Sequence, residues 1–91
     1  MAITWSSAAD KHGIPREEAL YAMTRPHDVY DPYGQVRPGQ SKAPTLFIGP
    51  SRFGTLEVLA MRTPPGGFFV FHVMLLRAST AASVGYEGEG A

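Results

Sequence analysis

The chain contains no cysteine among its 91 residues, which excludes a disulfide framework and any metal site built from thiolates. This absence agrees with a reducing compartment, and we expect the protein to act in the cytoplasm. The first five residues lack a basic region followed by an apolar core, so no secretory signal peptide is predicted.

Charged residues are also few, at 18% of the chain, and the net charge is zero. With 44% hydrophobic residues, this composition predicts a folded globule and not a disordered chain. The charge is unevenly placed, because residues 35–80 contain five arginines and lysines against a single glutamate. This basic region permits an anionic partner such as RNA, although arginines at solvated strand ends explain it equally well.

No apolar run reaches the length of about 20 residues that a membrane-spanning helix needs. The longest run, residues 68–77, follows the turn Pro64-Pro65-Gly66-Gly67 and is rich in Phe and Val. This pattern favours the central strand of a small sheet, with a buried helix as the alternative. Strict alternation gives the strand two faces, which are Phe69, Phe71, Val73, Leu75 and Arg77, and Phe68, Val70, His72, Met74 and Leu76.

Two short helices are predicted near the N-terminus. The first covers residues 8–12 and ends at Gly13, and the second opens at Pro15 and closes near Pro26. The apolar patterns predict strands over residues 28–31, 45–49, 55–62 and 68–77. Short turns join the last three of these strands.

These elements predict an α+β fold, in which two short N-terminal helices pack on a three- to four-stranded antiparallel meander. Residues 3–5 are either a short strand or an aromatic anchor, and residues 78–83 can form a short helix. We expect residues 1–84 to form a single compact domain and residues 85–91 to form a flexible acidic tail.

The sequence lacks the common catalytic signatures. It has no glycine-rich phosphate loop, no Gly-x-Ser-x-Gly elbow and no His-Glu-x-x-His motif. The three histidines are too scattered to indicate a metal site, so neither a metal nor another cofactor is predicted.

A helix laid across the meander could bring Lys11 and His12 close to Arg77 at the end of the long strand. Metal-free RNA cleavage needs a group that takes the proton of the ribose 2′-hydroxyl, an acid for the leaving oxygen and cations for the phosphate. We therefore predict His12 as the acid–base residue, with Lys11 and Arg77 as charge stabilisers. The other interpretation is that Lys11 and His12 cap a helix and that Arg77 is solvated.

Three further cations are predicted to hold the RNA backbone. Arg37 and Lys42 belong to a basic, proline-containing loop that we expect to be mobile, and Arg52 lies in a turn. His72 and His27 are given no catalytic role, because a histidine on an apolar strand face is more often a hydrogen-bonded core residue and His27 is expected on a loop surface.

The order of several short motifs is similar to that of BrnT-type toxins from bacterial type II toxin–antitoxin modules. Trp5 is followed by Lys11-His12-Gly13-Ile14 and by Glu17-Glu18-Ala19, and the strand ends in Leu75-Leu76-Arg77-Ala78. The resemblance implies a compact RelE-like ribonuclease fold, RNA cleavage that slows translation and a cognate antitoxin that neutralises the toxin. It assigns the functional positions to Lys11, His12 and Arg77.

Two hypotheses of different class follow. The first is a toxin-like, metal-independent endoribonuclease that acts on RNA or at the ribosome and is neutralised by an antitoxin. The second is a non-catalytic module on the same fold, encoded by a phage or mobile element, that binds a host protein. No membrane contact is expected, and homodimer formation is left open.

Overall fold

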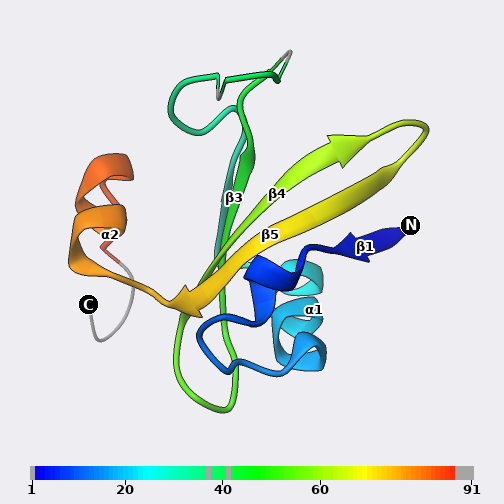
Figure 1. Cartoon of the computed structure of the whole chain (residues 1–91). Helices are drawn as coiled ribbons and strands as arrows, with labels where there is room; N and C mark the ends of the chain where they lie inside the picture. The colour runs from blue at the N-terminus through cyan, green and yellow to red at the C-terminus, as the bar shows by residue number, and fades with distance from the viewer. Residues whose placement is uncertain (1, 37, 41, 88–91) are drawn as a thin grey trace.

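The computed structural model describes residues 2–36, 38–40 and 42–87, and five strands form one mixed sheet in it (Figure 1). Their order across the sheet is β1-β5-β4-β3-β2. The strands are β1 (Ile3–Trp5), β2 (Asp28–Tyr30), β3 (Thr45–Gly49), β4 (Leu56–Thr63) and β5 (Gly67–Leu75). The helical elements are a 3₁₀ turn, η1 (Ser7–Asp10), and the helices α1 (Arg16–Thr24) and α2 (Ala78–Val84).

The predicted arrangement of two N-terminal helices on an antiparallel meander is wrong. The first predicted helix is only the 3₁₀ turn η1, because the segment between Ser6 and Gly13 is too short for a stable α-helix. The second predicted helix forms as α1, and the other helix of the structure, α2, lies at the C-terminus. Strand β1 pairs with β5 in parallel, which makes the sheet mixed. This pairing joins Ile3 to Phe68, and such a distant partner leaves no local signal in the sequence.

The three long strands form where the apolar pattern predicts them. Strand β5 is paired on both sides, with β1 and β4, although the middle position of the sheet belongs to β4. The predicted alternation along β5 is wrong beyond Val70, because Leu59 pairs with His72 while Ala60 pairs with Val70. Phe71 is therefore the extra residue of a β-bulge, and Val70 and Val73 share one face while His72 turns to the other.

Helix α1 and η1 cover the sheet face that carries Val58, Val70 and Val73. Ala19, Ala22 and Met23 of α1 and Ala9 of η1 are buried in the same apolar cluster as these valines. Helix α1 lies very close to β3, since a Cβ atom built on Gly49 would be 2.3 Å from the carbonyl oxygen of Ala22.

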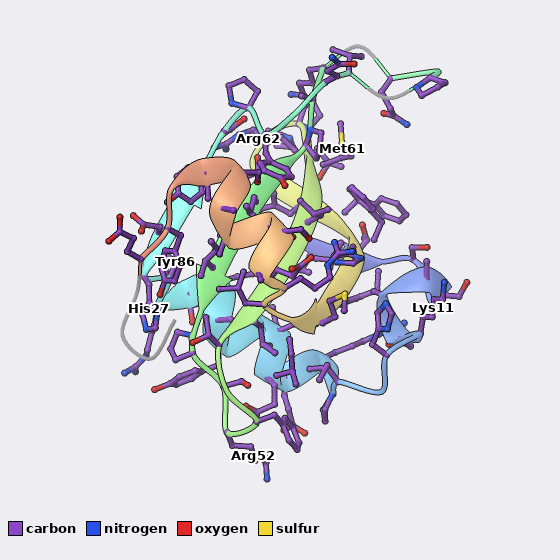
Figure 2. The ribbon with its side chains drawn as sticks, turned by 90° about the vertical axis from the view of Figure 1, so that its left-hand side faces the viewer. Lys11, His27, Arg52, Met61, Arg62 and Tyr86 are labelled. Carbon is purple, nitrogen blue, oxygen red and sulfur yellow. The ribbon has the colours of Figure 1, made fainter. Side chains whose placement is uncertain are left out.

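The opposite face of the sheet is partly covered by α2. Figure 1 shows α1 and α2 on opposite sides of the sheet, and in Figure 2 α2 lies in front of β3 and β4. Leu46 and Ile48 alternate with Phe47 along β3 and are fully buried on this second face. The same face carries the polar residues of the candidate site. In the described part of the chain, no helix is both long and apolar enough to cross a bilayer.

Candidate functional site

Glu57 is a charged residue at the centre of the sheet. It lies on β4, between β3 and β5, and its exposed fraction is 0%. A buried carboxylate is costly unless other groups donate hydrogen bonds to it or pair with its charge.

Arg77 supplies most of these donors. Its backbone N–H donates to Glu57 Oε1 at 2.9 Å, and its Nε and Nη2 atoms lie 3.1 Å and 2.7 Å from Oε2. Arg77 follows the end of β5 and forms the N-cap of α2, so the turn from strand to helix aims both its main chain and its side chain at Glu57. The Arg77 side chain remains half exposed.

Glu57 is ionised at neutral pH despite its burial. Burial by itself raises the pKa of Glu57, but hydrogen bonds from Arg77, His72 and Thr80 outweigh it, and the pKa lies below its usual value. The hydrogen bond with Glu57 raises the pKa of Arg77.

His72 is the third member of the cluster. Its register partner is Leu59, two residues along β4 from Glu57, so His72 and Glu57 are diagonal neighbours on one face. His72 Nε2 lies 2.8 Å from Glu57 Oε2. Because an ionised carboxylate only accepts hydrogen bonds, we assign the proton to Nε2, which leaves Nδ1 as the basic nitrogen of the neutral ring.

His12 packs edge-on against His72, with the ring centroids 5.8 Å apart. Its position comes from η1, which Ser6 attaches to β5 through a 2.8 Å hydrogen bond from its backbone N–H to the Val70 carbonyl. Gly13 then turns the chain with a φ of +73°, a value that a residue with a side chain rarely adopts. The two imidazoles thus come from segments 60 positions apart in the chain.

This arrangement has the parts of an acid–base site. The Glu57 carboxylate holds the tautomer of His72, a second imidazole lies beside it, and the Arg77 guanidinium provides a positive charge at the same carboxylate. We name Glu57, His72, His12 and Arg77 the histidine cluster. The described residues contain no group of three or more His, Cys, Asp or Glu side chains that could hold a metal ion.

Of the three predicted catalytic residues, the structure brings two together. His12 contacts His72 and Arg77 pairs with Glu57, so both belong to the histidine cluster. Lys11 is exposed, and Figure 2 shows it at the outer edge of the N-terminal segment, away from α2.

The predicted RNA-binding cations are not gathered in one place. Arg37 lies outside the described residues. Lys42 lines a hollow on the sheet together with Met61 and Phe69. Arg52 lies at the opposite end of the sheet from Met61 (Figure 2), where Glu18 accepts its backbone N–H at 2.9 Å and its Nε at 2.7 Å.

Glu57 and His72 were missed as site residues by the sequence reasoning. The one signal for Glu57 is that it is the only acidic residue between positions 35 and 80, placed within an apolar strand. A diagonal pairing with His72 depends on the bulge at Phe71, and the sequence gives no sign of that bulge. His27, the remaining histidine, lies elsewhere, with its Nδ1 2.9 Å from the Tyr86 hydroxyl.

Comparisons of the chain with models of protein families, with curated proteins and with solved structures give no match. The geometry of the histidine cluster and the pattern of the sequence are therefore the basis for assigning a function.

Proposed function

We propose that the protein is a metal-independent endoribonuclease that acts through the histidine cluster. The observation that carries the proposal is the contact between two imidazoles, one of which is hydrogen-bonded to a buried carboxylate that also pairs with an arginine. Two adjacent imidazoles supply both the base and the acid that RNA cleavage requires, and the arginine supplies the charge.

In the proposed reaction the 2′-oxygen of a ribose bonds to the adjacent phosphorus while the bond from phosphorus to the 5′-oxygen breaks. His72 Nδ1 accepts the proton of the 2′-hydroxyl, because Glu57 holds the other ring nitrogen as a donor. His12, in its protonated form, donates a proton to the leaving 5′-oxygen. The products are a 2′,3′-cyclic phosphate and a 5′-hydroxyl end.

Arg77 has the donors to bind the phosphate. Its hydrogen bonds to Glu57 use the backbone N–H, Nε and Nη2, so Nη1 stays available for a phosphate oxygen within the described structure. Anchoring by Glu57 also fixes the guanidinium before RNA binds, which lowers the ordering cost of the contact.

The proposal is tested by incubating purified protein with RNA in EDTA and mapping the new ends. We expect cyclic phosphate and 5′-hydroxyl products, and no cleavage of a 2′-deoxy substrate. His72→Asn should lower the rate about 10²- to 10⁴-fold, because it removes one proton-transfer group. His27→Asn is the matched control and should leave the rate unchanged, since His27 lies at Tyr86, away from the cluster. RNA that stays intact with wild-type protein, or cleavage that survives His72→Asn, would contradict the proposal.

The resemblance to BrnT-type toxins supports a cellular role for this activity. We propose that cleavage in the cytoplasm slows translation and that a cognate antitoxin binds the protein and neutralises it. Induced expression should then stop growth, and co-expression of the product of an adjacent small gene should restore it. Growth that continues under induction would count against the toxin role.

A non-catalytic interaction module is the second candidate. It is favoured by β2, which lies at an edge of the described sheet and exposes 44% of Val29, so that a partner strand can pair there. Growth arrest that is equally strong in His72→Asn, with no new RNA ends, would support this module instead of the ribonuclease.

A further inference from the structure

We infer that a hollow beside the histidine cluster binds a nucleobase of single-stranded RNA. The hollow has a volume of about 420 Å³ and is lined on the sheet by Met61, Phe69 and Phe71, with Gln40 and Lys42 from the loop before β3. This volume lies within the range of small-molecule sites. The inference deepens the proposed ribonuclease function and takes from it the identity of the ligand as RNA.

The hollow and His72 lie on the same face of the sheet. Met61 pairs with Phe69 across β4 and β5, and Leu59, two residues from Met61 along β4, pairs with His72. Side chains two residues apart on one strand face are about 7 Å apart. The bulge at Phe71 is what keeps His72 on the face of Phe69, so an RNA strand that follows β5 can place a phosphate at the histidines and the next base in the hollow.

The chemistry of the hollow suits a base next to a phosphate. Phe69 exposes 37% of its surface, and an aromatic ring stacks on any base because every base has a π-face. Lys42 places a cation on the rim for the backbone, and the amide of Gln40 can both donate to and accept from a base edge. Arg62 also borders the hollow, but its Nε donates to the carboxylate of Asp31, so Lys42 is the cation assigned to RNA.

Phe53, which is also exposed, does not offer such a site. Phe53 lies next to Arg52 at the opposite end of the sheet, and Glu18 accepts two hydrogen bonds from Arg52. The hollow there is bordered by Glu17 as well as Glu18, and these carboxylates repel a phosphate backbone. Charge complementarity therefore selects the hollow at Phe69.

The test measures binding of fluorescent 2′-O-methyl oligonucleotides, which lack the 2′-hydroxyl and stay intact, to the full chain. Phe69→Ala should weaken binding about 5- to 150-fold, the range for losing one stacked base. Phe69→Trp keeps a stacking ring and should restore the affinity. Phe53→Ala, the matched control, should bind as the wild type does. Circular dichroism checks that all three variants are folded.

Several results would overturn the base site. These are an unchanged affinity in Phe69→Ala, an equal loss in Phe53→Ala, equal binding of an abasic oligonucleotide, or no binding by the wild type. Cleavage of unmodified RNA, measured in parallel, separates the two proposals. Binding that depends on Phe69 without cleavage leaves the base site standing and rejects the ribonuclease, whereas cleavage with unchanged binding in Phe69→Ala does the reverse.

Discussion

At the scale of single residues, Glu57 connects the other members of the candidate site. It is fully buried, and hydrogen bonds from Arg77, His72 and Thr80 keep its carboxylate ionised. The same hydrogen bonds give His72 its tautomer and fix the Arg77 guanidinium. One residue thus serves stability and the proposed chemistry together. Its partners come from β5, from the turn after β5 and from α2, so the carboxylate gains all of its donors only when α2 is packed on the second face of the sheet.

We predict that Glu57→Gln lowers the free energy of unfolding by about 1–3 kcal/mol at pH 7, because the amide cannot accept from Arg77 and His72 at both positions. The folded-state pKa of Glu57 lies below its usual value of 4.5, so its ionised form stabilises the fold above pH 4.5. This contribution is lost as the pH falls through the folded pKa, and the difference between wild type and variant should shrink in acid.

Urea unfolding at pH 7 and at pH 4 or below measures this prediction. Glu17→Gln is the control, since Glu17 is exposed, and it should change stability by no more than about 0.5 kcal/mol. A Glu57→Gln variant as stable as the wild type at pH 7 would show that the carboxylate does not hold the cluster together.

At the scale of elements, whether a feature could be predicted from the sequence depends on how far apart its interacting residues lie in the chain. The long strands and α1 follow from local apolar patterns and from Pro15 and Pro26, and they could be predicted. The parallel pairing of β1 and the bulge at Phe71 depend on contacts between distant segments, so they could not. His12 and Arg77 could be named from residue chemistry, but their link through Glu57 and His72 required the register of β4 and β5.

The contact of α1 with β3 gives a prediction at this scale. Gly49→Ala should destabilise the protein by about 1–3 kcal/mol, because the new methyl group would lie 2.3 Å from the carbonyl oxygen of Ala22, a main-chain atom that can move only with its helix. Such a loss corresponds to a fall in Tm of about 4–8 °C per kcal/mol.

Gly66→Ala provides the comparison, because a Cβ atom there meets nothing within 4 Å. Its Tm should stay close to that of the wild type. If thermal unfolding gave the two alanine variants the same Tm, the close packing of α1 on β3 would be refuted.

At the scale of the whole molecule, the apolar cluster and the candidate site lie on opposite faces of the sheet. One face of the sheet holds the apolar cluster under η1 and α1, and the other carries Glu57, His72 and the hollow at Phe69. The chain is neutral. Glu17 and Glu18 border the hollow at Arg52, which Figure 2 shows at the end of the sheet opposite Met61. A weak overall field then leaves the proposed RNA binding to local contacts at Arg77 and Lys42.

The most direct test of the central claim is a double-mutant cycle of RNA cleavage rates with His12→Ala and His72→Asn. If both imidazoles act on one phosphate, each single variant should lose most of the activity and the double variant should be little slower than either, because residues that act as a unit are not additive. Single variants that cleave RNA at the wild-type rate, or losses that multiply in the double variant, would contradict the account.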